Sequence, residues 1–518
     1  MASRLSAECL MKIIGKFGYE SWSEENDFTT LFSCSMVNRE WCKIAIPILW
    51  RFPIEWLTLP PSEITGRFSP LVATYIQCLP KETRDELAKS NILSTESIYE
   101  QPIFDYPSFL RRFNYVWFEY AIELFLLKRN TSSSKTNREI HKLHTFLILE
   151  NFCKLFMERC TKLEYLEFIC PYGCDFDTKS FVCLPSLPYA SSSLRNLTSF
   201  SCKGCTQSNI MHEMAKFCVF IENFRVECLC QDNDGLATLI EAQRGIKVLC
   251  LRGDFYRSPV DIPKLQKAIG SRLSNLNMLD MFPICLPLNI FAPCEKLSYL
   301  SFSVRFKEET IEMDSFANSH FPNLEFVKAK FSIMRIGQLT SLLKNTNGQI
   351  TRISVKYKSL LDPTCTSSYV TTLVNHFPNL QEYSGPFPSD HISQLTCLFK
   401  NCVHLTHLKI CNSHEEDVPA NLKFHSISEI LQNLGNLVPP KLKKFSLPSN
   451  WTYSPEALES FFKSIEGRSI KLLDFQIKLY LNEINNKDIH DVLFRYINRG
   501  VIMDYSRRYV SFSFFVCG

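Results

Sequence analysis

A short apolar pattern recurs through most of this 518-residue chain. It consists of an apolar residue, two residues of any kind, a second apolar residue, one further residue and a third apolar residue. The pattern occurs twelve times, beginning at Leu163, Leu194, Ile221, Ile246, Leu276, Leu297, Leu324, Ile350, Leu380, Leu405, Leu442 and Ile470. It is imperfect in three of them, where Ser199, Ala329 and Gly385 stand at the third position in place of a large apolar residue. Successive starts lie 21 to 37 residues apart and average about 28. Twelve occurrences in phase favour an internal repeat over a chance series of leucines.

Segments with helical spacing precede most of these occurrences. Before Leu405, for example, Ile392, Leu395, Leu398 and Phe399 fall on one face of a helix. A unit of one strand and one helix cannot bury its apolar faces alone, so neighbouring units must stack. The pattern therefore predicts an α/β fold, a curved solenoid with an inner parallel sheet and outer helices. The spacing resembles that of leucine-rich repeats, and the 37-residue interval after Leu405 must contain an insertion.

Three short helices are predicted before residue 53. An amphipathic helix begins near Leu5 with Ser6 as its N-cap, and a second begins near Phe28. A third apolar stripe runs from Val37 to Leu49, with Pro47 expected to kink it. Helices this short cannot close a large core within about 50 residues, so a partner surface is expected.

The segments LSAECLMKIIGKF and LFSCSMVNREWCKIAIPILW resemble an F-box. This three-helix motif docks a substrate receptor onto the Skp subunit of an SCF-type (Skp, cullin, F-box) ubiquitin ligase. The family usually has proline after the first leucine, where this chain has Ser6. The resemblance implies Skp contacts at Leu5, Leu10, Ile13, Ile14, Leu31, Val37, Trp41, Ile48, Leu49 and Trp50.

An F-box followed by leucine-rich repeats is a known family arrangement. It implies a non-catalytic receptor subunit that binds Skp and, through Skp, a cullin and a RING protein, while the repeats hold a target protein. The implied domains are an F-box at 1–53, a helical connector and solenoid cap at 54–138, and a solenoid of about twelve repeats at 139–518. The alternative is a leucine-rich-repeat scaffold without a ligase role, in which Trp41 and Trp50 are core residues of a helical cap.

Composition narrows the function classes. The chain has 57 basic and 53 acidic residues, which gives a net charge of +4. A charge this small for the size of the chain does not predict binding to nucleic acid or to an anionic membrane. No secretory signal or spanning apolar run is found, and the 22 cysteines are scattered. We therefore expect a soluble protein of the cytoplasm or nucleus with reduced cysteines.

Two groups of residues raise the possibility of a metal site. Cys202 and Cys205 form a C-x2-C pair, but no second such pair follows at the spacing of a zinc ribbon. A second set consists of Cys402, His404, His407, Cys411 and His414, whose side chains the repeat pattern places on different faces. No phosphate-binding loop, nucleophile elbow or H-E-x-x-H pair occurs. We expect no metal, no cofactor and no catalytic residue.

The residues between the apolar positions of each repeat should line the concave face of the sheet. Candidate substrate-binding residues on that face are Tyr165, Arg225, Arg352, His407, Lys409, Lys443, Lys444 and Lys471. Their charge becomes more positive toward the C-terminus, which favours an acidic or phosphorylated segment of a target. A generic solvated face is the alternative.

Overall fold

The structure is a computed structural model of the chain. It describes residues 6–15, 25–53, 61–93, 101–128, 135–169, 182–253, 261–303, 314–331, 336–357, 363–387, 391–411, 424–448, 450–468, 470–472, 474–477, 486–503 and 505–507. The chain divides into two compact units. The N-terminal unit comprises residues 1–246 and 260–272, and the C-terminal unit comprises residues 247–259 and 273–518.

The N-terminal unit begins with three short helices, α1 (Ala7–Ile14), α2 (Glu25–Ser35) and α3 (Arg39–Leu49). The predicted N-cap is confirmed, because the Ser6 side chain accepts a hydrogen bond from the backbone N–H of Cys9. Asn38 caps α3 in the same way, because its side-chain oxygen accepts a hydrogen bond from the backbone N–H of Trp41. The three helices share a small core that consists of Ile14, Leu31, Ala45, Ile48 and Leu49.

An aromatic-rich helical segment follows. Its helices are α4 (Pro61–Cys78), α5 (Lys81–Lys89), α6 (Tyr106–Phe109), α7 (Tyr115–Leu127) and α8 (Lys135–Arg159). The Tyr75 ring is fully buried, with its centroid 5.6 Å from that of Phe118 and 5.0 Å from that of Phe156. Edge-to-face and tilted contacts of this kind add to the stability gained from apolar burial.

The sheet begins earlier than the predicted boundary at residue 139. Strand β1 (Arg112–Asn114) lies within the predicted connector and pairs in parallel with β2 (Tyr165–Glu167), with Phe113 opposite Leu166. Leu110, Phe113 and Tyr115 are buried and have the same spacing as the repeat pattern. The connector therefore contributes a strand to the sheet as well as helices.

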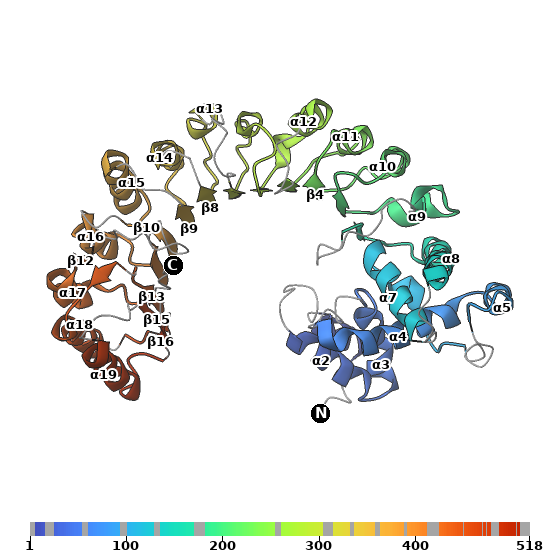
Figure 1. The fold of residues 1–518 in the computed structure, drawn as a ribbon, viewed down its shortest axis with the longest axis horizontal. Helices are drawn as coiled ribbons and strands as arrows, with labels where there is room; N and C mark the ends of the chain where they lie inside the picture. The colour runs from blue at the N-terminus through green and yellow to red at the C-terminus, as the bar shows by residue number, and fades with distance from the viewer. Residues whose placement is uncertain are drawn as a thin grey trace, which may run out of the picture. The chain divides into compact units, whose positions relative to one another are not determined.

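The remaining strands of the N-terminal unit are β3 (Ser199–Lys203) and β4 (Asn223–Leu229), and β1 to β4 pair in sequence order in parallel. Its other α-helices are α9 (Ala190–Leu194), α10 (Ser208–Ala215), α11 (Asp234–Glu241) and α12 (Pro263–Gly270). Helices α10 to α12 lie on the same side of β3 and β4 (Figure 1). Phe200 and Phe224 are paired in register and bury their rings between strands and helices.

Strands and helices also alternate in the C-terminal unit. Ten strands pair in parallel: β5 (Val248–Gly253), β6 (Met278–Met281), β7 (Tyr299–Ser303), β8 (Phe326–Phe331), β9 (Arg352–Tyr357), β10 (Glu382–Pro386), β11 (His407–Cys411), β13 (Lys444–Ser446), β15 (Asp474–Ile477) and β16 (Tyr505–Arg507). The helices are α13 (Asp314–Ala317), α14 (Ile336–Lys344), α15 (Pro363–His376), α16 (Gln394–Asn401), α17 (Ser428–Leu434), α18 (Pro455–Gly467) and α19 (Asn486–Asn498).

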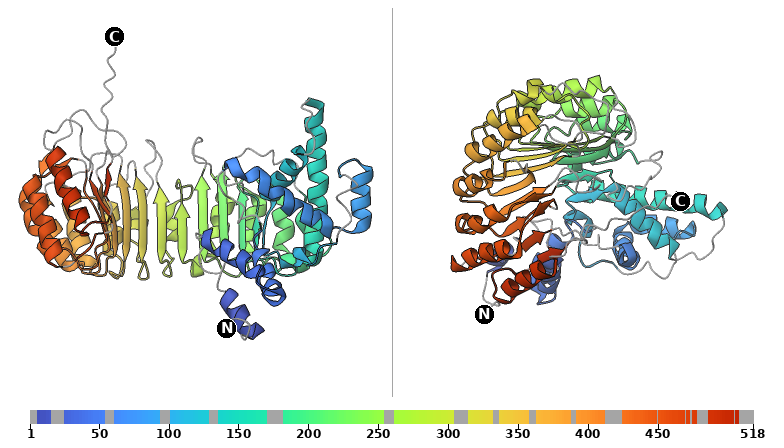
Figure 2. Two further views of the ribbon diagram at one scale, coloured as in Figure 1. Left: turned by 90° about the horizontal axis from the view of Figure 1, so that it is seen from below. Right: turned by 60° about the vertical axis from the view of Figure 1, so that its left-hand side comes forward.

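Within this unit the described helices cover one face of the sheet, and the strands run side by side in one direction (Figures 1 and 2). The opposite face of the strands is free of described helices, and we call it the free strand face. A separate pair, β12 (His425–Ser426) and β14 (Trp451–Thr452), forms a two-stranded sheet. Strand β12 falls in the longest interval between two patterns, where the insertion is predicted.

All twelve occurrences of the apolar pattern overlap strands, namely β2 to β11, β13 and β15. In β5, side chains alternate between buried and more exposed, because successive residues point to opposite faces. The predicted α/β class with a parallel sheet is thus confirmed.

A buried asparagine connects two neighbouring repeats of the N-terminal unit. Asn233 caps α11 by accepting from the N–H of Leu236, and its amide donates to the carbonyls of Gly204 and Thr206. These groups are shielded from water, so each would be costly to leave without a partner. Asn233 therefore links the turn after β3 to the start of α11.

Candidate interaction surfaces

The ten residues for which a Skp contact is predicted divide into distinct environments. Leu5 lies outside the described residues. Five are buried in the helical segment and hold it together: Leu10, Ile14, Leu31, Ile48 and Leu49. Trp41 is half-buried and packs against the core of the three helices. Only Ile13 and Val37 have exposed side chains, so most of this predicted set supports the fold rather than presenting a surface.

Trp50 contacts the chain's own helical connector. Its ring centroid lies 4.1 Å from that of Tyr106 and 5.5 Å from that of Tyr75. The adjacent carbonyl of Arg51 accepts hydrogen bonds from the backbone N–H groups of Arg111 and Arg112. These contacts fix the end of α3 to the start of β1.

Large apolar side chains are exposed on the three N-terminal helices. We call the following five residues, which are 49 to 73% exposed, the apolar set: Met11, Ile13, Phe32, Met36 and Val37. Met11, Phe32 and Met36 were not predicted as contacts, because spacing alone does not tell which of two neighbouring apolar residues points outward. Burial of such side chains by a partner contributes roughly 1.5–3 kcal/mol each when complete.

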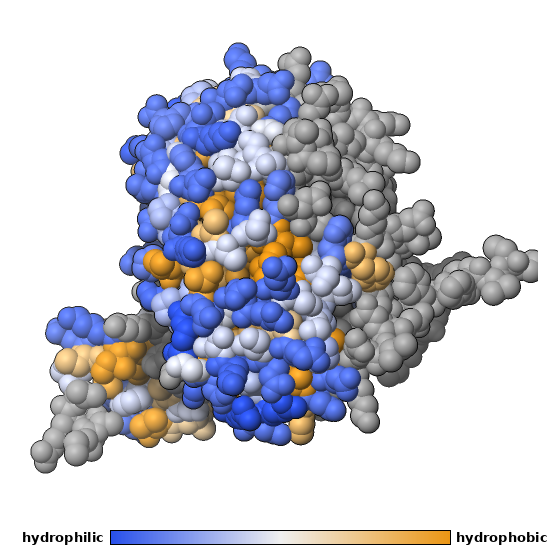
Figure 3. Space-filling model, turned by 90° about the vertical axis from the view of Figure 1, so that its left-hand side faces the viewer, coloured by the Kyte–Doolittle hydropathy of each residue, from blue (hydrophilic) through white to orange (hydrophobic). Residues whose placement is uncertain are grey.

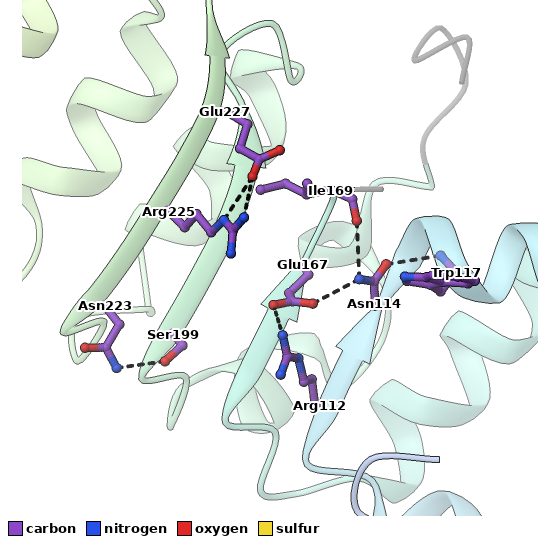
Figure 4. A network of polar contacts seen from close by, with 9 residues as sticks. All are labelled: Arg112, Asn114, Trp117, Glu167, Ile169, Ser199, Asn223, Arg225 and Glu227. Carbon is purple, nitrogen blue, oxygen red and sulfur yellow. Dashed lines mark hydrogen bonds and ion pairs between the residues drawn. The ribbon is translucent and has the colours of Figure 1, made fainter. Parts of the chain in front are cut away.

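The strand face of the N-terminal unit carries a polar network between β1 and β2 (Figure 4). Glu167 on β2 accepts hydrogen bonds from Arg112 and Asn114 on β1, and the bond from Asn114 Nδ2 to Glu167 Oε2 measures 2.9 Å. Asn114 also donates to the Ile169 carbonyl and accepts from the N–H of Trp117 at the start of α7. The network thus links two strands and a helix.

The predicted binding residues of this unit are already engaged. The Arg112 guanidinium lies over the Tyr165 ring, and its central carbon is 5.5 Å from the ring centroid. Arg225 forms an ion pair with Glu227 on the same strand, with a shortest N–O distance of 2.6 Å. The strand face of the N-terminal unit therefore offers paired charges rather than an excess of one sign.

Five predicted residues lie toward the end of the C-terminal unit. His407, Lys444 and Asp474 occupy one register row of β11, β13 and β15, and Glu382 precedes them on β10. His407 Nδ1 lies 3.8 Å from Glu382 Oε1. Burial lowers the pKa of His407, and the carboxylate of Glu382 acts in the opposite direction. Lys409 is half-buried and lies two residues after His407 on β11. Lys443 and Lys471 are exposed and come just before β13 and β15.

Basic residues also lie on strands nearer the middle of the chain, and not only toward its C-terminal end. Arg352 lies on β9, and it is joined by Lys328 and Lys330 on β8 and by Lys356 on β9, which were not predicted. On the helix side over α15 to α19, hydrophilic side chains cover most of the surface and apolar ones gather in the middle (Figure 3).

The cysteines and histidines that raised the possibility of a metal site lie in different environments. Cys202 is buried, and burial raises the pKa of its thiol. Cys402 is also buried, its thiol donates to the Phe377 carbonyl, and burial raises its pKa to about 12. His404 is exposed, and His414 lies outside the described residues. In the described part of the chain, no three His, Cys, Asp or Glu residues are placed to share a metal ion. None of the described helices combines the length and apolar character needed to cross a membrane.

Comparison with known proteins adds no relative: no family model matches the chain, and a search of curated proteins finds no match.

Proposed function

We propose that this chain is the substrate-receptor subunit of an SCF-type ubiquitin ligase. The three N-terminal helices would dock on Skp, and the strand faces would hold a target protein. Such a receptor supplies no acid, base or nucleophile. It acts by raising the effective concentration of target lysines near a charged conjugating enzyme brought by the cullin and the RING protein.

The apolar set carries this proposal. The three helices fill their own small core with residues such as Ile14 and Leu31, and still expose Phe32 and Met36 to solvent. Exposed apolar side chains on short helices are typical of a protein interface. The resemblance of the same segment to an F-box gives the partner its identity, because the F-box family docks on Skp.

Trp50 favours a second candidate, a repeat scaffold without a ligase role. Its contacts with Tyr75 and Tyr106 are those of a helical cap, and a cap needs no partner. In that case the apolar set would bind another protein or a second copy of the chain.

Co-expression separates the two candidates. The full chain is produced with Skp, a cullin and a RING protein, and the purified material is analysed for all four subunits. The ligase proposal predicts a stoichiometric complex that also discharges ubiquitin from a conjugating enzyme. Recovery of the chain without Skp would favour the scaffold.

A further inference from the structure

The last described helix of the C-terminal unit, α19, packs beside α18 on one flank, and no described helix lies beyond it (Figure 1). Arg495 and Arg499 of α19 form ion pairs with Glu459 and Glu466 of α18, with N–O distances of 2.5 and 3.4 Å. The Tyr496 hydroxyl also donates a hydrogen bond to the backbone carbonyl of Glu459. These contacts fix the flank of α19 that faces the preceding repeat.

Helices α18 and α19 occupy equivalent places in successive repeats. The buried residues Leu458, Phe461, Phe462 and Ile465 of α18 recur in the same order in α19 as Ile489, Val492, Leu493 and Tyr496. By the same correspondence, Glu459, Lys463 and Glu466 of α18 match His490, Phe494 and Ile497 of α19. Glu459 and Glu466 face the helix that follows α18, so their counterparts in α19 face away from α18. We call His490, Phe494 and Ile497 the outer flank.

The outer flank is apolar at a place where a repeat array is expected to end in polar residues. Phe494 is 55% exposed, and its ring stacks on that of His490 with an interplanar angle of 10°. Ile497 is half-buried. The equivalent positions of α18 carry three charged side chains. An exposed apolar end makes a repeat array prone to association, so the outer flank requires a cover.

The chain itself supplies an apolar segment at this place. Strand β16 ends at Arg507 and opens the next repeat, whose helix would pack on the outer flank. Residues 508–518 lie outside the described residues. Within them, residues 509–516 read YVSFSFFV, in which six of eight residues are apolar and none is charged. In the preceding repeat, residues 478–485 connect the end of β15 to the start of α19, so a segment of eight residues can pass from the strands to the helices.

We infer that residues 509–516 pack on the outer flank and close the apolar end of the C-terminal unit. In an extended segment, the alternate residues Val510, Phe512 and Phe514 lie on one side and can cover Phe494, while the serines between them face solvent. The segment is joined to β16, so its effective concentration at the outer flank exceeds that of a second copy of the chain. The inference does not depend on a ligase role.

Photocrosslinking in the full-length chain tests this inference. The photoreactive amino acid p-benzoylphenylalanine replaces Phe494, and the crosslinked peptides are identified by mass spectrometry after proteolysis. We expect most of the product to join α19 to a peptide that contains residues 509–516 of the same molecule. The same replacement at Val403, which is 48% exposed in the same unit, should give at least about tenfold less of this product, because the segment is not held beside it.

A mixture of isotopically labelled and unlabelled chains identifies the occupant. Products that join a labelled peptide to an unlabelled one would show that a second copy covers the outer flank, and would overturn the inference. Crosslinks from position 494 that fall only outside residues 509–516 would overturn it as well.

Hydrogen exchange of α19 gives a second readout. The double variant Phe512→Ser, Phe514→Ser should speed amide exchange in residues 489–498 by about tenfold, because α19 loses the packing on its outer flank. The matched variant Ser511→Ala, Ser513→Ala changes the same segment without removing its rings and should exchange like the parent chain. Equal exchange rates in α19 for the parent chain and the phenylalanine variant would refute the contact.

Discussion

Trp50 packs its ring against that of Tyr106, with centroids 4.1 Å apart. The last tryptophan of the segment that resembles an F-box therefore packs within the chain itself. The same motif exposes Val37 and Met36 thirteen or so residues earlier. These two environments separate the residues that stabilise the segment from those that are available to a partner, and the predictions below use that separation.

Truncation of Trp50 should destabilise the N-terminal unit. Replacing a buried Trp with Ala typically costs 3–5 kcal/mol, and because Trp50 is half-buried we expect Trp50→Ala to cost about 2–3 kcal/mol. Urea unfolding followed by tryptophan fluorescence and circular dichroism measures the change. The control Ile103→Ala alters a side chain that is 90% exposed and should shift the unfolding free energy by less than about 0.5 kcal/mol. Equal effects of the two variants would contradict the anchoring contact.

Removal of the Glu167 carboxylate should take away the acceptor that Arg112 and Asn114 share. Both Arg112 and Glu167 are mostly buried as side chains, so we expect Glu167→Ala to cost about 1–3 kcal/mol in unfolding free energy. Arg225→Ala breaks a more exposed pair and should cost about 0–1 kcal/mol. A double-mutant cycle of Arg112→Ala and Glu167→Ala measures the coupling directly, and a coupling near zero would refute the network.

Loss of the buried amide of Asn233 should weaken the link between the turn after β3 and the start of α11. Asn233→Ala removes a helix cap and two donors, and we expect a cost of about 2–4 kcal/mol. Asn233→Asp keeps the capping acceptor and loses the two amide donors to Gly204 and Thr206. Thermal unfolding should rank the parent chain first and both variants below it. An Asp variant as stable as the parent would show that the two carbonyls do not need these bonds.

Stability should depend on pH through Glu119. Burial, and then the carboxylate of Glu123, raise the pKa of Glu119 to about 7, while Lys142 acts in the opposite direction. The native state therefore holds a proton that the unfolded chain has released, so this contribution to stability is present below about pH 4.5 and is lost as the pH rises through about 7.

The variant Glu119→Gln should remove this dependence. Since the side chain is partly exposed, we expect the variant to be about 1–2 kcal/mol more stable than the parent at pH 8 and nearly equal to it at pH 4.5. Urea unfolding at several pH values measures the difference. Glu158→Gln on the exposed side of α8 serves as the control. A constant difference between Glu119→Gln and the parent across the pH range would contradict the raised pKa.

Twelve of the described strands were predictable from the sequence because most of them carry three apolar residues at fixed spacing. Strand β1 has the same spacing at Leu110, Phe113 and Tyr115, but α7 and α8 separate it from the next strand, so a search for regular intervals passes over it. Strands β12 and β14 contain two residues each and have no pattern to detect.

The surfaces were less predictable, because exposure depends on packing between helices. Ile13 and Ile14 are adjacent in sequence, as are Leu31 and Phe32, yet only Ile14 and Leu31 are buried. Helical periodicity does not decide between such neighbours. Cross-strand register is hidden in a similar way, because the sequence does not tell that Lys330 pairs in register with Lys356 rather than with a carboxylate.

Calorimetric titration of the full-length chain with purified Skp tests the central proposal most directly. The double variant Phe32→Asp, Val37→Asp places charge in the apolar set without touching the buried core, and Ile103→Asp, Val403→Asp changes two other exposed apolar residues in the same way. We predict that the parent and the second variant bind Skp alike, and that the first variant loses at least about 100-fold in affinity, or roughly 2.7 kcal/mol. Absence of Skp binding by the parent chain, or equal binding by all three proteins, would contradict the account.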